Sequence, residues 1–182
     1  MRLIVHEGVK AALQAGRPVV ALESTIITHG LPRPINYEMA VAAQDQIRRV
    51  GAEPATIAIL DGRAHIGLDK SQLMRISDSD PVRTIKAGRG SLAQVLAQGR
   101  GWIGGTTVSG TMALAQRAGI RIFATGGIGG VHRGAESCTF PILLSHSFQS
   151  HGCVSRFDRA GSDPCGCILF RCQVNFGYST NP

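Results

Sequence analysis

Short apolar runs alternate with helix-forming segments through residue 123, and this alternation constrains the fold more than any other feature. The runs with continuous apolar character are typical of strands that are covered on both faces. The predicted strands are residues 19–22, 56–60, 64–68, 82–86 and 120–123. The predicted helices are residues 9–15, 37–50 with Asn36 as cap, 70–76 with Asp69 as cap, 91–97 and 112–118. Such alternation predicts an α/β fold with a largely parallel sheet.

The composition is that of a globular protein with excess positive charge. Hydrophobic residues make up 43% and charged residues 17% of the chain, and no apolar run reaches the roughly 18 residues of a membrane span. Residues 1–7 lack the apolar core of a secretory signal, so a cytoplasmic location is expected. The net charge of +7 indicates affinity for anions, but the basic residues are scattered among few aromatics. A phosphorylated metabolite is therefore expected before nucleic acid.

Residues 120–136 begin as a short strand and continue into a loop that holds five glycines, I-R-I-F-A-T-G-G-I-G-G-V-H-R-G-A-E. Glycine lets the backbone approach a ligand closely, and α/β proteins commonly bind small molecules where a strand enters such a loop. His132, Arg133 and Glu136 add polar side chains to it. We therefore expect a small-molecule site here.

Glu23 directly follows the apolar run at residues 19–22. A carboxylate at the end of a buried strand is unusual, because burial penalises its charge. From position alone, Glu23 is as well explained by a structural role, at the surface or as a cap of the next helix, as by a functional one.

Two further segments are candidate anion sites. Lys86 precedes A-G-R-G, and cations beside a glycine-rich backbone bind oxyanions, although a solvated lysine and arginine are the alternative. Residues 104–111, G-G-T-T-V-S-G-T, precede the last predicted helix, whose N-terminus could hold an anion or could simply be capped. His65 is expected to be a surface or internally satisfied residue and not a ligand.

Four motifs, taken together and in order, resemble pseudouridine-5'-phosphate glycosidase. They are A-L-E-S-T-I-I-T-H-G, P-A-T-I-A-I-L-D-G, G-G-T-T-V-S-G-T-M and F-A-T-G-G-I-G-G-V-H-R-G-A-E, and the resemblance covers about residues 5–136. It implies reversible cleavage of the C–C glycosidic bond of pseudouridine 5'-phosphate to uracil and ribose 5-phosphate. It also implies a divalent metal, usually Mn²⁺, and homotrimers of three-layer α/β/α subunits with a largely parallel or mixed sheet.

The resemblance implies roles for individual residues. The family forms a Schiff base from a lysine to the anomeric carbon, and a carboxylic acid manages protons on the ring oxygen and the base. Glu23 matches this catalytic acid. Lys86 matches a lysine at the phosphate end of the substrate, and Val108 matches a backbone contact to the substrate. His132 lies in the matching active-site loop.

The sequence departs from the family pattern at two places. The family's K-x-S-R-R-D-L is K-A-G-R-G-S-L here, so Arg89 is kept while Gly90 and Ser91 replace an arginine and an aspartate that bear on phosphate affinity. After G-A-E, the family's D-[IV]-S-A-D-L supplies a metal-binding aspartate and its G-V-K-S-I-L-D supplies the nucleophilic lysine. Neither motif occurs, and residues 137–182 contain no lysine or glutamate. The expected domain is therefore truncated, and no metal ligand is assigned in it.

We interpret residues 137–182 as a family gene read out of frame. When residues 151–180 are back-translated and read one base later, permitted codons include M-D-V-S-A-D-L-T-E-L-G-R-T-P-V-A-V and then, after three residues, G-V-K-S-I-L-D-I. Residues 137–150 would be extra, and residues 139–149 can be encoded by a pyrimidine-rich tract ending in CAG, as at a splice acceptor. All five cysteines lie in this tail, and we interpret them as unselected thiols and not as a disulfide framework or zinc site.

The expected organisation is thus residues 1–136 as the N-terminal part of the glycosidase domain and residues 137–182 as a tail without a family counterpart. A tail that was not selected to pack is expected to lack consistent order and to expose apolar surface. Three functions are compatible with the sequence. They are the family's glycosidase activity in impaired form, a catalytically inactive fragment or decoy subunit that retains anion binding, and a basic anion-binding module unrelated to glycosidase chemistry.

Overall fold

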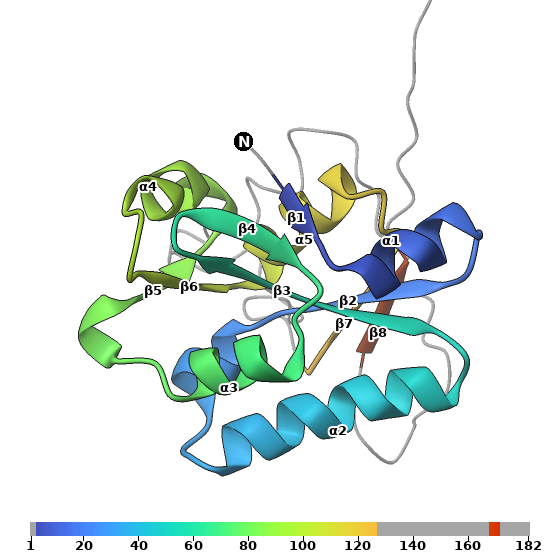
Figure 1. Ribbon diagram of the computed structural model, residues 1–182, viewed down its shortest axis with the longest axis horizontal. Coiled ribbons are helices and arrows are strands. Elements are labelled where there is room, and N and C mark those ends of the chain that lie inside the picture. The colour runs from blue at the N-terminus through green and yellow to red at the C-terminus, as the bar shows by residue number, and fades with distance from the viewer. Residues whose placement is uncertain (1–2, 127–167, 172–182) are drawn as a thin grey trace, which may run out of the picture.

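The computed structural model describes residues 3–126 and 168–171, which form a mixed sheet of eight strands with helices on both faces (Figure 1). The strands are β1 (Leu3–Val5), β2 (Val19–Leu22), β3 (Glu53–Leu60), β4 (Arg63–Ile66), β5 (Thr84–Ala87), β6 (Ile103–Thr106), β7 (Ile122–Thr125) and β8 (Ile168–Arg171). The helices are α1 (Glu7–Gln14), α2 (Ile35–Arg49), α3 (Lys70–Ser77), α4 (Leu92–Ala97) and α5 (Val108–Arg117). Shorter turns are the π-helical η1 (Ile26–Gly30) and the 3-10 turns η2 (Pro81–Arg83) and η3 (Arg89–Ser91). The predicted α/β fold is confirmed.

Strand β3 organises the sheet, because its two halves have different neighbours. The first half pairs with parallel β2, and the second half pairs with antiparallel β4 on one edge and antiparallel β6 on the other. Strands β2 and β6 therefore run toward each other along one edge of β3. Leu22 pairs with Thr56 and Gly105 pairs with Ala58, so the carboxyl ends of both strands meet opposite Ile57.

The outer strands complete the sheet on both sides of this junction. Strand β5 pairs parallel with β6, β7 pairs parallel with β2, and β1 pairs parallel with β4. Strand β8 pairs antiparallel with β7, from Ile122 opposite Arg171 to Thr125 opposite Ile168. The result is a mixed sheet in which β2, β5, β6 and β7 all deliver their carboxyl ends toward the central region.

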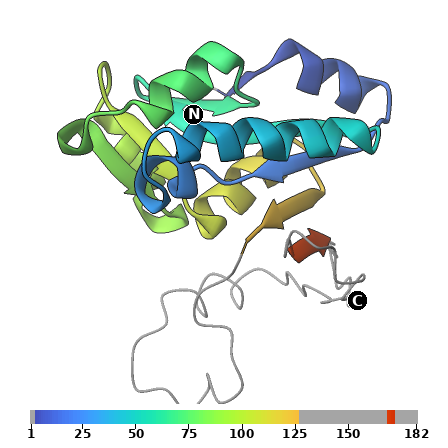
Figure 2. The ribbon, with the colours of Figure 1, turned by 90° about the horizontal axis from the view of Figure 1, so that it is seen from below.

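Alternate residues of β3 pack into separate cores on the two faces of the sheet. Ile57 packs with α1 and α5, whereas Ala58 and Leu60 pack with η1, α2 and α3. Ile59 packs against α4 through Val95. Figures 1 and 2 show α2 and α3 covering one face while α1, α4 and α5 cover the other. This burial of both faces is why β3 has a continuous apolar run instead of an alternating one.

Most predicted elements are present with shifted ends. Asp69 caps α3 as predicted, since its side chain accepts from the Gln72 backbone and the Gln72 side chain accepts from the Asp69 backbone. Helix α5 begins at Val108, four residues before the predicted start at residue 112, because Thr107 is its cap. The predicted strand at 82–86 begins only at Thr84, because η2 occupies the residues before it.

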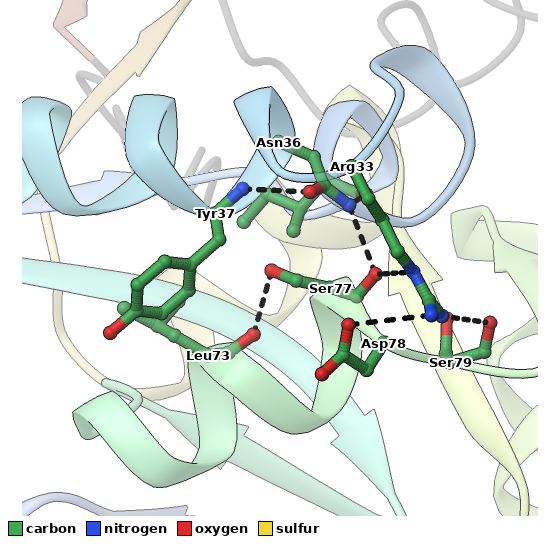
Figure 3. Close-up of polar contacts among 8 residues, drawn as sticks. Arg33, Asn36, Tyr37, Leu73, Ser77, Asp78 and Ser79 are labelled. Carbon is green, nitrogen blue, oxygen red and sulfur yellow. Dashed lines mark hydrogen bonds and ion pairs between the residues drawn. The ribbon is translucent and has the colours of Figure 1, made fainter.

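The prediction that Asn36 caps α2 is wrong. The helix begins at Ile35 after Pro34, and Asn36 lies in its first turn. The buried amide of Asn36 instead donates to the carbonyl oxygen of Ile27 at 2.9 Å. It also donates to the carbonyl oxygen of Ser77 at 3.0 Å (Figure 3). Asn36 therefore ties α2 to η1 and to the end of α3, because both buried carbonyls need a donor.

Arg33 reinforces the same connection from the loop before α2. Its Nε donates to the Ser77 carbonyl at 2.9 Å and its Nη2 to the Ser79 carbonyl at 3.2 Å, beside an ion pair with Asp78 (Figure 3). These bonds, with those of Asn36, fix η1, the segment that directly follows the end of β2.

Part of the predicted tail contributes the strand β8, whereas most of residues 137–182 lie outside the described residues. The expectation that this tail lacks consistent order stays a prediction. In the part of the chain that the structure describes, no helix has both the length and the apolar character needed to cross a membrane.

Candidate functional site

A network of buried hydroxyl groups joins the ends of β2 and β6. Ser24 Oγ and Thr106 Oγ1 each donate to the Ile57 carbonyl oxygen at 2.6 Å, and Thr111 Oγ1 donates to Thr106 Oγ1 at 2.9 Å. The Thr106 amide donates to Ser24 Oγ at 2.9 Å. These three hydroxyl residues are fully buried, so the network fixes the place at which each strand ends. Glu23 and Thr107, the first residues after β2 and β6, are thereby held where the two strands meet.

Glu23 is the first residue after β2, and its side chain is half-buried next to the end of β7. Thr125 Oγ1, at the end of β7, donates to Glu23 Oε1 at 2.5 Å. Burial raises the pKa of the Glu23 carboxyl, and the hydrogen bond from Thr125 opposes part of this rise. The residue that caps the following η1 turn is Thr25, so Glu23 is neither a helix cap nor a fully exposed residue. A carboxyl with a raised pKa is suited to exchanging a proton near neutral pH.

Lys86 is the third residue of β5, opposite Gly105 of β6, and its side chain is exposed. His29 of η1 lies near it: burial lowers the pKa of His29, the charge of Lys86 lowers it further, and a hydrogen bond to the Thr84 backbone opposes both effects. Thr28 Oγ1 and His29 Nδ1 are 2.7 Å apart. Within residues 3–126, no carboxylate forms an ion pair with Lys86. Its ammonium group is therefore available to an external anion.

The first turn of α5 lies against the glycine-rich loop that follows β5. The Thr107 amide donates to the Ala87 carbonyl at 3.1 Å, and the Arg89 amide donates to Ser109 Oγ at 3.2 Å. Val108 is the first residue of α5, at the positively polarised end of the helix. Thr107 caps the helix, as one of the two interpretations of the sequence expects, and the helix begins next to the strand of Lys86. That this N-terminus also holds an anion stays a prediction.

The two residues that depart from the family pattern lie in this loop. Ser91 Oγ accepts from the Gly88 amide at 3.1 Å and donates to the Gly88 carbonyl at 3.2 Å. Ser91 therefore holds the loop backbone in place. A Cβ added at Gly90 would meet no atom within 4 Å, so this position is open to solvent or ligand.

Lys86 lies near the end of β5 and Val108 begins α5, which follows the neighbouring strand β6, while Glu23 follows β2 where that strand meets β6. No hydrogen bond or ion pair among the described residues joins Glu23 to Lys86. His132 lies outside the described residues, and its role stays a prediction. A surface hollow between β1 and α1 contains none of the predicted site residues; it is lined by Leu3, Val5, Glu7, Lys10, Leu13 and Gln14.

The described residues do not fit a manganese site by themselves. Across residues 3–126, no three His, Cys, Asp or Glu side chains come together in a way that could hold a metal ion. Such sites need several oxygen or nitrogen ligands, which a lone Glu23 does not provide.

Sequence reasoning missed three features of the site. They are the hydroxyl network of Ser24, Thr106 and Thr111, the position of His29 beside Lys86, and the pairing of Thr125 with Glu23. The sequence did contain a signal for the pairing of Thr125 with Glu23. Thr125 is the last residue of β7, Glu23 is the first residue after β2, and these two strands are parallel neighbours.

An acid, a lysine and a helix N-terminus near the carboxyl ends of strands in an α/β sheet are typical of a small-molecule binding site. The family model for indigoidine synthase A like proteins matches residues 8–142, and the chain belongs to this family. Its sequence is 55% identical over 135 residues to a pseudouridine-5'-phosphate glycosidase from Rhodospirillum centenum, covering 74% of this chain and 41% of that protein. A protein of the same name from Mycoplasmopsis agalactiae is 51% identical over 142 residues, covering 78% of this chain and 46% of the relative.

Solved structures agree with this assignment. The prealnumycin C-glycosynthase AlnA, solved with ribulose 5-phosphate, superposes with a TM-score of 0.63 at 40% identity, covering 74% of this chain and 42% of that one. An indigoidine synthase A-like protein from Thermotoga maritima superposes with a TM-score of 0.58 at 33% identity, covering 73% of this chain and 42% of that one. The chain therefore spans less than half the length of the relatives that it matches.

Proposed function

We propose that this chain carries the phosphate-binding and proton-handling part of a pseudouridine-5'-phosphate glycosidase, with impaired turnover. The observation that carries the proposal is the meeting of β2 and β6 opposite Ile57, which gathers Glu23 and the N-terminus of α5 at one place. The names of the relatives described above support the substrate, and the sugar phosphate in the AlnA structure supports a ribose phosphate at this site.

The phosphate binds between Lys86 and the first turn of α5 in this proposal. Lys86 contributes a positive charge that no carboxylate of the described residues neutralises in an ion pair, and the amides of Val108 and Ser109 contribute the polarised helix end. The anomeric carbon then lies toward Glu23, since phosphate and anomeric carbon are at opposite ends of the ribose. This orientation explains why Glu23 and Lys86 share a site without touching each other.

Glu23 exchanges a proton with the ring oxygen or the base in this proposal. The raised pKa of its carboxyl keeps the acid form available at a higher pH than an exposed glutamate allows. Bond cleavage also needs a nucleophile, and the lysine that resemblance assigns to this step has no counterpart in residues 137–182. We therefore propose that turnover by this chain is much slower than turnover by its longer relatives.

The absence of that lysine favours a second candidate function, an inactive fragment or decoy subunit that retains anion binding. Uracil released from pseudouridine 5'-phosphate distinguishes the two candidates, because only the first produces it. Borohydride trapping of ribose 5-phosphate, followed by peptide mapping of the labelled amine, would show whether one of the three lysines, Lys10, Lys70 or Lys86, replaces the nucleophile.

Replacing Lys86 with methionine should weaken binding of ribose 5-phosphate about tenfold or more. A hydrogen bond to a charged group contributes roughly 1.5–3 kcal/mol, and methionine keeps the apolar length of the side chain without its charge. Isothermal titration calorimetry of the 182-residue chain measures the effect.

The matched control is Lys70→Met, which removes the same charge from the exposed start of α3. It should leave the affinity for ribose 5-phosphate within about twofold of wild type, because a distant surface charge is screened by salt. Equal affinities for wild type and Lys86→Met would place the phosphate elsewhere and remove the basis for the proposed function.

A further inference from the structure

We infer that Thr125 is a positioning residue that orients the Glu23 carboxyl, holding Oε1 so that Oε2 is the oxygen that exchanges the proton. This inference deepens the proposed function and rests on it for the role of Glu23. The geometry that carries it is the contact from Thr125 Oγ1 to Glu23 Oε1 at 2.5 Å, which joins the ends of two neighbouring strands.

The sheet fixes both members of this pair. Strands β2 and β7 are parallel, with Ala21 opposite Phe123 and Leu22 opposite Ala124, so the next residues of each strand are brought side by side. Thr125 is only 4% exposed, and a β-branched side chain has few accessible rotamers. Its hydroxyl group therefore has a defined direction, unlike that of an exposed serine or threonine.

The hydrogen bond makes the two carboxyl oxygens chemically different. Among the described residues, Oε1 accepts from Thr125, whereas Oε2 has no hydrogen-bond donor from the protein. A proton on the carboxyl then prefers Oε2, since the carbonyl oxygen of a protonated carboxyl accepts a hydrogen bond better than the hydroxyl oxygen does. When the proton leaves Oε2 for the substrate, the O–H bond breaks, its electron pair stays on Oε2, and the new negative charge is shared with Oε1. The Thr125 donor stabilises that charged form more than the neutral one.

This arrangement balances two opposing effects on one acid. Burial favours the neutral carboxyl and by itself makes its proton harder to release. The hydrogen bond from the Thr125 hydroxyl lowers the pKa of Glu23 and so opposes part of the effect of burial. Removing the hydroxyl should therefore change the titration of Glu23 without changing the burial of its side chain.

Carbon-13 titration of the glutamate carboxyl groups tests this inference on the intact chain. The chain has five glutamates, and the Glu23 signal is assigned as the one missing from Glu23→Gln. Thr125→Val keeps the shape of the side chain and removes the donor, so the pKa of Glu23 should move upward. Thr125→Ser keeps a donor, and the pKa should return toward that of wild type.

A pKa of Glu23 that stays unchanged or falls in Thr125→Val would overturn the positioning role. Thermal unfolding of each variant checks that the fold is kept; if Thr125→Val unfolds, Thr125→Ala removes the donor without putting a methyl group in its place. The titration needs no turnover and no ligand. Failure to bind ribose 5-phosphate would therefore contradict only the proposed function. An unchanged pKa of Glu23 in Thr125→Val would contradict only the role of Thr125.

Discussion

Replacing Glu23 with glutamine is expected to lower the rate of uracil release from pseudouridine 5'-phosphate by at least about 100-fold. A positioned acid contributes roughly 10²–10⁴-fold to a proton-transfer step, and glutamine cannot exchange a proton although it can still accept the hydrogen bond from Thr125. Chromatographic measurement of uracil over long incubations detects the slow reaction. Glu38→Gln, at an exposed position of α2, is the matched control and should keep the wild-type rate.

The same substitution should not lower the free energy of unfolding. A slower reaction of Glu23→Gln would then reflect loss of the acid and not unfolding of the chain. The pKa of Glu23 is raised in the folded chain, so folding favours its protonated form. The burial penalty on its charged form is absent at low pH and grows as the pH rises through the folded pKa. Glu23→Gln removes that penalty, and its unfolding temperature should match or exceed that of wild type at neutral and alkaline pH. A large drop in the unfolding temperature would show that Glu23 is a structural residue.

Gly110→Ala is expected to destabilise the folded chain by about 3 kcal/mol. Gly110 lies in the first turn of α5, and an added Cβ would fall inside van der Waals contact with the Ala87 carbonyl oxygen of the backbone. Helix α5 must then move away from the end of β5, because a backbone atom cannot turn aside as a side chain can. The better helix propensity of alanine offsets about 1 kcal/mol of the expected cost. Denaturant unfolding measures the difference in free energy.

Gly90→Ala is the matched control for this substitution. It lies in the neighbouring loop, where an added Cβ would contact nothing within 4 Å, so its free energy of unfolding should change by less than about 0.5 kcal/mol. Because Gly110 sets the distance between α5 and β5, Gly110→Ala should also weaken ribose 5-phosphate binding. A Gly110→Ala chain with wild-type stability would show that α5 does not pack on β5 as described.

The fold was predictable where a segment is long or strongly apolar. The continuous runs that form β2 and β3 identify buried strands, and the Asp69 capping box identifies the start of α3. Strand β1 was not predicted, because three half-buried residues give too short a pattern. The role of Asn36 was missed because its partners, Ile27 and Ser77, become neighbours only in the folded chain.

The site was predictable only as separate residues. Glu23, Lys86 and Val108 stand in motifs whose order indicates a family, but no local pattern says that β2 and β6 meet opposite Ile57. The two strands meet there because β3 pairs with β2 along its first half and with β6 along its second half. Likewise, the contact between Glu23 and Thr125 spans 102 positions of sequence and depends on the register of β2 with β7.

The position at which ribose 5-phosphate binds tests the proposed site most directly. Amide spectra of the isotopically labelled chain, recorded during titration with ribose 5-phosphate, locate the ligand residue by residue. The largest shifts should fall on Val108 and Ser109 at the start of α5 and on Gly88 and Arg89 in the loop beside it. Shifts confined to other parts of the chain, or no shifts at millimolar ligand, would contradict a sugar-phosphate site at the meeting of β2 and β6.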